Sequence, residues 1–130
     1  MKLKIITHEK IVFDEDVDEI VVQTKTGQLG ILKDRLPITT VLSIGVTKVK
    51  QGEIYRYFAT MGGVFQFKDN IATILTDVCE DGRDVDVTRA NEAKKRAETR
   101  LADSAAEIDI QRAQAALARA LARLKAALSK

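Results

Sequence analysis

Six arginines in the last third of the chain are the side chains whose spacing is best suited to chemistry. They form two trios with the same spacing of 7 and 4 residues: Arg89, Arg96 and Arg100, then Arg112, Arg119 and Arg123. On a helix this spacing places each trio along one face. Guanidinium groups bind phosphates through paired hydrogen bonds, so two such faces lining one cleft would suit a polyanion the size of a nucleotide triphosphate.

Two other interpretations of the arginines remain open. Each trio could lie on a solvated face, with ion pairs such as Glu92 to Arg96 worth a few tenths of a kcal/mol, and the spacing alone favours this interpretation. Residues 83–130 carry a formal charge of +4 and residues 1–82 carry −2, so the tail could also be a basic nucleic-acid-binding module. All six aromatic residues precede residue 83, which leaves the tail without a stacking platform for single strands.

The residue types that usually carry catalysis are too few to form a site. His8 is the only histidine and Cys79 the only cysteine, so neither a catalytic triad nor a metal site can be assembled around them. We expect an exposed histidine, a buried structural thiol and a solvated acidic turn at residues 14–16. The sequence therefore predicts no catalytic residues, no metal and no required cofactor. An enzyme acting on a nucleotide is the less favoured alternative.

The elements that position these residues change type near Gly82. All seven glycines and the single proline, Pro37, lie at or before this residue, where short β-branched and aromatic runs alternate with turn residues. This pattern predicts an antiparallel sandwich or barrel of about nine strands. The predicted strands are 2–7, 11–13, 18–24, 27–32, 38–43, 46–50, 53–60, 64–68 and 71–77.

The remainder is rich in Ala, Leu, Arg, Lys and Glu and predicts two helices. Asp86 is the expected N-cap of a helix over 87–102. Ser104 or a neighbour is the expected N-cap of a second helix, which ends near Leu128. Their apolar stripes are narrow and mainly alanine: Ala90, Ala93, Ala97 and Leu101, then Ala106, Ile110, Ala113, Leu117, Ala120 and Leu124. We expect an antiparallel hairpin of marginal stability, and two domains, 1–84 and 85–130.

No secretion signal or membrane-spanning run is evident, and a single cysteine is typical of a reducing compartment. The chain is therefore expected to be soluble, although it could lie beside a membrane.

Several segments together resemble one protein family. They are Thr26–Leu32 (TGQLGIL), Leu36–Ile38 (LPI), Leu42–Gly45 and Met61–Val64 (MGGV), followed by the alanine-rich hairpin. In this order they resemble the epsilon subunit of the F-type ATP synthase over essentially the whole chain. The resemblance implies an amino-terminal antiparallel β-sandwich of about ten strands and a carboxy-terminal two-helix hairpin.

The resemblance also implies a function and partners. Members are non-catalytic rotor subunits that bind the gamma subunit and the c-ring and couple ion translocation to ATP synthesis. In bacterial members the hairpin is mobile and inhibits ATP hydrolysis when it extends between the alpha and beta subunits of the headpiece. The implied location is peripheral, on the cytoplasmic face of the bacterial plasma membrane or, alternatively, on the thylakoid membrane. Nucleic acid is not an implied partner.

Some members bind ATP as a regulatory ligand through a motif Ile/Leu-Asp-x-x-Arg-Ala, which residues 85–90 (VDVTRA) resemble. The implied site has acidic residues toward the base and arginines on the triphosphate: Glu80, Asp86, Arg89, Arg96, Arg119 and Arg123. This match shifts our interpretation of the arginines from solvated faces to an ATP site. Val85 in place of Ile or Leu removes a little apolar contact. Arg35, where the family commonly has His, alters the loop expected to face the c-ring or gamma.

Overall fold

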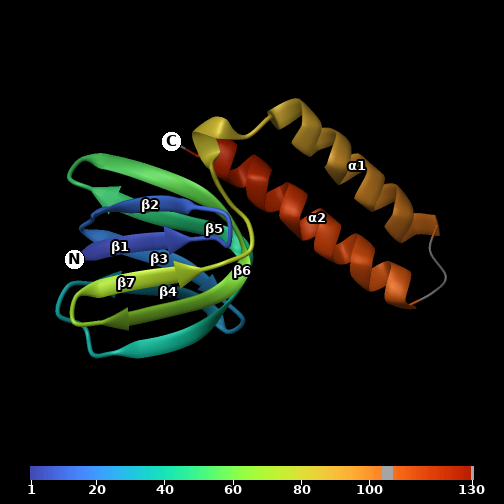
Figure 1. Cartoon of the computed structure of the whole chain (residues 1–130). Coiled ribbons are helices and arrows are strands. Elements are labelled where there is room, and N and C mark those ends of the chain that lie inside the picture. The colour runs from blue at the N-terminus through green and yellow to red at the C-terminus, as the bar shows by residue number, and fades with distance from the viewer. Residues whose placement is uncertain (104–106, 130) are drawn as a thin grey trace.

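The computed structural model describes residues 1–103 and 107–129, which fold into a β-sandwich followed by a helical hairpin (Figure 1). A short 3₁₀ helix, η1 (Gly82–Asp84), connects the two parts. Eight strands precede it within the described residues, which confirms the predicted fold class: β1 (Lys2–Ile6), β2 (Ile11–Asp16), β3 (Glu19–Thr24), β4 (Gly27–Leu32), β5 (Ile38–Gln51), β6 (Ile54–Lys68), β7 (Ile71–Leu75) and β8 (Cys79–Asp81).

The strands form one sheet in the order β2-β1-β7-β6-β5-β3-β4, with β8 added beside β6. The long strands β5 and β6 belong to both layers of the sandwich. The second half of β6 pairs with β7, and its first half pairs with β8. Neighbouring strands are antiparallel except β1 and β7, which are parallel. The two layers enclose a core of large apolar side chains that includes Phe58, Phe65 and Phe67.

Continuous β5 and β6 correct the predicted strand count. The predicted strands end near Ile44 in β5 and near Met61 in β6, but these two residues are partners in a ladder that keeps its register from Ile38 to Gln51, and Gly45 pairs with Thr60. The glycines bend the strands instead of ending them. Gly62 and Gly63 have φ of 77° and 110°, a region open to glycine, so the chain turns between layers and continues.

Strand β8 was missed because it is only three residues long and lies next to the change in composition. It pairs with β6, so that Phe58 lies opposite Asp81 and Thr60 opposite Cys79. Cys79 is buried, as expected, and burial raises the pKa of its thiol to about 11. The thiol is therefore protonated at neutral pH and serves as a small packing residue.

Both predicted helices are present: α1 (Val87–Asp103) and α2 (Glu107–Leu128). Ala90 and Ala97 of α1 are buried, and so are Ala113 and Ala120 of α2, as the stripes predict. The alanines let the helices pack side by side along their lengths (Figure 1). Ser104 and Ala106, which the sequence analysis placed at the cap and on the stripe of the second helix, lie outside the described residues.

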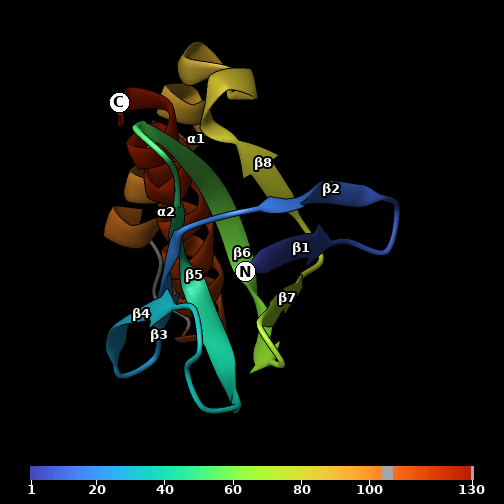
Figure 2. The same ribbon diagram turned by 90° about the vertical axis from the view of Figure 1, so that its left-hand side faces the viewer.

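Helix α2 lies between α1 and the sheet, against β5 and β6 (Figures 1 and 2). The contact is built on three buried alanines, Ala59 of β6 with Ala122 and Ala126 of α2. Partly buried side chains surround them: Ile44, Val46, Tyr57 and Met61. Neither helix, over the part of the chain described, is long and apolar enough to cross a membrane.

Candidate functional site

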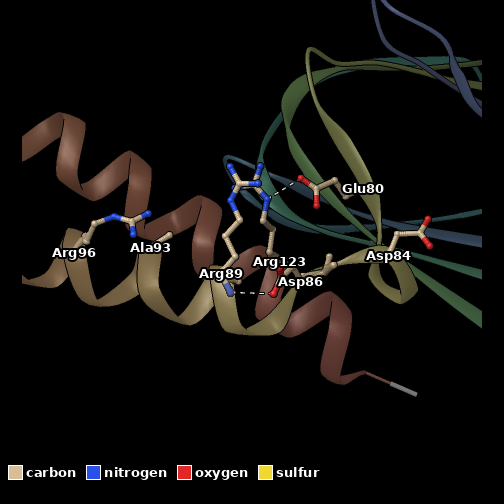
Figure 3. Close-up of a pocket in the computed structure, with 9 residues that line it drawn as sticks. Glu80, Asp84, Asp86, Arg89, Ala93, Arg96 and Arg123 are labelled. Atoms are coloured by element: carbon tan, nitrogen blue, oxygen red, sulfur yellow. Dashed lines mark hydrogen bonds and ion pairs between the residues drawn. The ribbon is translucent and has the colours of Figure 1, made fainter.

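A pocket of about 400 Å³ lies where β8, the start of α1 and the end of α2 meet. Its walls carry three arginines and three carboxylates, with small apolar residues between them (Figure 3). The lining residues are Glu80, Asp84, Val85, Asp86, Arg89, Ala90, Ala93, Arg96 and Arg123. The sandwich and both helices therefore contribute to one hollow.

The start of α1 is fixed by Asp86, which is the helix cap that the sequence predicts. Its Oδ1 accepts a hydrogen bond from the backbone N–H of Arg89 at 3.1 Å, and its carbonyl accepts one from Ala90 at 3.0 Å. From this cap the helical period places Arg89, Ala93 and Arg96 on one wall of the pocket. Alanine at position 93 leaves open space between the two arginines.

An ion pair between Glu80 and Arg123 crosses the pocket. Arg123 Nε donates to Glu80 Oε1 at 2.9 Å, and about a third of each side chain is exposed. This pair joins β8 to α2. In Figure 3 the side chains of Arg89 and Arg123 extend toward the end of the pocket where Glu80 lies, whereas the carboxylate of Asp84 points away from them.

Arg89 and Arg96 form no ion pair with any carboxylate whose position the structure describes. Both side chains are exposed and border the hollow. Repulsion between the guanidinium groups is offset on one side by Glu80, which neutralises Arg123. An anion entering the pocket would meet two arginines that no described carboxylate pairs with, so this wall of the pocket is suited to phosphate oxygens.

The structure brings together five of the six residues predicted for the ATP site, namely Glu80, Asp86, Arg89, Arg96 and Arg123. Arg119 is not part of the lining. It lies one turn before Arg123 on α2 and is half-buried. Asp84 and Ala93 also line the pocket and were not among the predicted residues, although the helical period from Arg89 identifies position 93.

The two arginine trios do not line one cleft along their whole length. Arg100 and Arg112 border a second hollow of about 410 Å³, with Thr99, Asp103, Asp109 and Ala113. The reason is the antiparallel arrangement, which sets the first turns of α1 beside the last turns of α2 and the last turns of α1 beside the first of α2. Each trio is therefore divided between the two ends of the hairpin.

A charge network centred on the buried Asp81 carboxylate lies beside the pocket, and the sequence did not indicate it. Asp81 Oδ2 accepts hydrogen bonds from Arg56 Nη2 and Arg83 Nη2, both at 2.7 Å, and Oδ1 accepts one from the Arg83 backbone N–H at 2.9 Å. Burial acts to raise the pKa of Asp81, but the hydrogen bonds from Arg83 and Arg56 outweigh it and lower the pKa to about 2.

Arg56 connects this network to the sandwich. Its guanidinium lies 4.9 Å from the ring centroid of Phe13 and 5.3 Å from that of Phe58, and it also donates to Glu15 at 3.2 Å. Alternation along β6 places Arg56 on the same face as the buried Phe58, but its charge is typical of a position facing water, so the sequence did not indicate a buried ion pair there. The network fastens η1, and hence the residues just before the pocket, to the sandwich.

His8, the histidine of the sequence, lies outside this region. His8 is exposed on the surface, with Nε2 3.9 Å from a carboxylate oxygen of Glu9. Within the residues described, no cluster of three or more histidine, cysteine, aspartate or glutamate side chains could hold a metal ion.

The sequence matches two family descriptions that divide at the same place as its composition. Residues 1–82 match "ATP synthase, Delta/Epsilon chain, beta-sandwich domain", and residues 83–127 match "ATP synthase, Delta/Epsilon chain, long alpha-helix domain". An ATP synthase epsilon chain of Symbiobacterium thermophilum is 46% identical over 128 residues, which are 98% of this chain and 92% of the relative. An ATP synthase epsilon chain of Desulforamulus reducens is 41% identical over 126 residues, 97% of this chain and 96% of the relative.

Solved structures include chains of the same fold. One, from the Euglena gracilis mitochondrial ATP synthase (OSCP/F1/c-ring), superposes with a TM-score of 0.83 at 22% identity, over 98% of this chain and 80% of that one. A second, from the Tetrahymena thermophila mitochondrial ATP synthase (central stalk/c-ring), gives a TM-score of 0.69 at 20% identity, over 97% and 95% of the two chains. At these identities the likeness establishes the arrangement of sandwich and hairpin.

Proposed function

Because this chain belongs to the ATP synthase delta/epsilon family, with epsilon chains of bacteria among its relatives, we propose that it is a regulatory subunit of the central stalk. In this role the sandwich binds the gamma subunit and the c-ring, and so takes part in coupling ion translocation to ATP synthesis. The subunit is non-catalytic, since the family's catalytic sites lie in other subunits. It is peripheral to the membrane, on the cytoplasmic face in a bacterium.

An apolar row on the outside of the sandwich supports a protein partner. Val41, Val64 and Leu75 are direct neighbours on β5, β6 and β7 and are 53%, 39% and 51% exposed. Three large apolar side chains side by side on an outer sheet face are unusual for a surface that meets only water. The row is suited to docking another subunit.

The hairpin is proposed to be the regulatory part, able to leave the sandwich and obstruct hydrolysis in the catalytic headpiece. Its contact with the sheet supports this role because the fully buried centre of the contact consists of alanine methyl groups, and the larger side chains around them are only partly buried. Burying a methyl group contributes about 0.8 kcal/mol, against about 1.5 to 3 kcal/mol for a whole Leu or Ile side chain. A ligand that binds only the docked hairpin would therefore change its position appreciably.

The pocket between β8, α1 and α2 is proposed to bind ATP, and the observation that carries this proposal is its lining. Arginines from both helices converge on a hollow of about 400 Å³, within the range of about 300 to 1,000 Å³ found for small-molecule sites. Arg89, Arg96 and Arg123 would neutralise the triphosphate, and Glu80 and Asp86 would lie toward the base. A ligand held from both helices and β8 fastens the hairpin to the sandwich.

Arg119 is included in the proposed site although it does not line the pocket. It is four residues, about 6 Å along the helix axis, from Arg123, and a long flexible side chain can cover that distance by changing rotamer. We expect Arg119 to add to phosphate binding less than Arg89 does.

Thermal unfolding of the isolated chain with increasing ATP tests the nucleotide site. We expect ATP to raise the Tm, because a ligand that binds only the folded state stabilises it. The double variant Arg89→Ala with Arg123→Ala should lose this rise. Its matched control is Arg100→Ala with Arg112→Ala, which removes the same charge from the other end of the hairpin and should keep the rise.

Equal Tm shifts in both double variants would show that ATP acts through general charge, and the proposed site would be wrong. The basic tail as a nucleic-acid module has weaker support, because half of the charged residues lining the pocket are acidic. Tight, salt-dependent binding of DNA that the Arg100 and Arg112 control abolishes would favour it instead.

ATP hydrolysis by the reconstituted headpiece tests the regulatory role. The chain truncated after Asp84 keeps all eight strands and loses both helices, so it should still bind gamma while hydrolysis increases. Hydrolysis that is unchanged by the truncation would count against inhibition by the hairpin.

A further inference from the structure

Gly82, the first residue of η1, lies directly against the backbone of α2. A Cβ atom built on this buried glycine would lie 2.6 Å from the carbonyl carbon of Ala126, and closer still to the carbonyl oxygen. It would also lie 3.1 Å from the carbonyl oxygen of Tyr57 on β6. Real Cβ atoms essentially never lie under 3.0 Å from such an atom, so a side chain at position 82 cannot coexist with the docked helix.

The backbone conformation of Gly82 does not itself require glycine. The residue is absent from those with positive φ, which include Gly27, Gly52, Gly62 and Gly63. Its neighbours Asp81 and Val85 are extended and cap η1. Glycine at position 82 is therefore explained mainly by the proximity of α2, and the tight contact with the Tyr57 carbonyl of β6 is the lesser constraint.

The same two segments build this contact and the candidate pocket. Arg123 lies three residues before Ala126 on α2, and Glu80 lies two residues before Gly82. The ion pair of Glu80 with Arg123 and the approach of Gly82 to Ala126 are thus neighbouring links between β8–η1 and the end of α2. Any displacement of Ala126 from Gly82 must also move Arg123 relative to Glu80.

We propose that Gly82 is a positioning residue that permits α2 to dock and thereby assembles the pocket. The absence of a side chain allows backbone to meet backbone, which sets how far Arg123 reaches over β8. An alanine at this position would leave the eight strands intact and hold the end of α2 off the sheet. The consequence for ATP rests on the proposed function, whereas the consequence for docking does not.

Hydrogen exchange followed by mass spectrometry on the full chain tests this inference with Gly82→Ala. Amides of α2 should exchange at least about 10-fold faster than in the original chain, because the overlap opens the docked state, while those of β1 and β7 keep their protection. The rise in Tm with ATP should shrink or disappear in the same variant. Gly30→Ala is the matched control, since a Cβ there meets nothing within 4 Å.

A second variant adds a larger side chain to the docking contact from β6 instead of from η1. Ala59→Val adds bulk where β6 faces Ala122 and Ala126, and valine is well suited to a strand, so the same loss of α2 protection is expected.

Protection of α2 in Gly82→Ala equal to that in Gly30→Ala would overturn the inference. So would loss of protection in β1 and β7, because Gly82 would then be required by the sandwich itself. Absence of any ATP effect in the original chain would contradict the nucleotide site, and the exchange comparison would still decide the role of Gly82.

Discussion

Replacing Asp81 by Asn should destabilise the protein in a way that depends on pH. The carboxylate receives hydrogen bonds from Arg56 of β6 and Arg83 of η1, and only 10% of its side chain is exposed. Glu15 of β2 contacts the same Arg56 guanidinium on its other side. Asparagine keeps the size of the side chain, but it cannot match the charged hydrogen bonds to two guanidinium groups.

The pKa of Asp81 gives the magnitude of the expected loss of stability. It falls from 3.8 to about 2, since the hydrogen bonds from Arg83 and Arg56 outweigh the opposing effect of burial. A lowering of this size corresponds to about 2 kcal/mol of stability contributed by the ionised form. The folded-state pKa lies below the unfolded one, so this contribution is fully present above pH 3.8 and is lost as the pH falls through about 2.

Urea unfolding of both chains between pH 7 and pH 2 measures the effect. The free energy of unfolding of Asp81→Asn should be lower by about 2 kcal/mol at pH 7, and the difference should shrink steeply below pH 4. Asp14→Asn is the control. Asp14 pairs with Lys2 on the surface, where both side chains are more than a third exposed, so its loss should cost under about 1 kcal/mol.

A difference between the original chain and Asp81→Asn that stays constant down to pH 2 would refute this reasoning. The variant would then be destabilised by packing or by the cap of η1, neither of which requires ionisation.

Two further predictions concern the sandwich. The buried Cys79 thiol, whose pKa burial raises to about 11, should resist a thiol reagent at neutral pH in the native protein and react at once in denaturant; rapid native reaction would contradict the buried placement. Gly63→Ala should cost more than about 2 kcal/mol in urea unfolding, because φ is 110° and a Cβ would lie 3.0 Å from backbone atoms of Leu75 and Thr76. Gly52→Ala is its control, with φ of 60° and open space around the new atom, and should cost about 1 kcal/mol. Equal costs would show that the packing at Gly63 is unimportant.

Local signals account for the parts of the fold that the sequence predicted. Alternation and turn residues located most strands, and helix formers after a capping aspartate located α1 and its first residue. The same signals failed where distant contacts decide the structure. Gly45 and Gly62 look like turn residues, but pairing on both sides of the bend keeps β5 and β6 continuous. Strand β8 exists because β6 has a free edge beside it, which no local pattern reveals.

The candidate site also has a part that local spacing predicted and a part that depends on distant contacts. Helical spacing identified Arg89 and Arg96 on one face, and an antiparallel hairpin brings Arg123 to them. Two-residue spacing places Arg56 beside Phe58 on one face of β6, but its contact with the ring of Phe13 comes from a distant strand, and spacing does not reveal that contact. The sequence also did not indicate that Arg119 lies outside the lining of the pocket. It depends on how α2 is rotated against the sheet, which the alanines of both elements determine.

The charge network and the glycine contact divide the connection between sandwich and hairpin into a fixed and a movable part. Asp81 binds Arg56 and Arg83, so residues up to η1 are held to the sandwich by charged hydrogen bonds. Beyond η1, Val85 is extended and Asp86 already caps α1, which leaves Val85 as the link between the two parts. If the hairpin leaves the sheet as proposed, rotation about this link moves Arg89 and Arg123 away while Glu80 stays behind. A ligand that contacts all three opposes that rotation directly, so its affinity and the docking of the hairpin must change together.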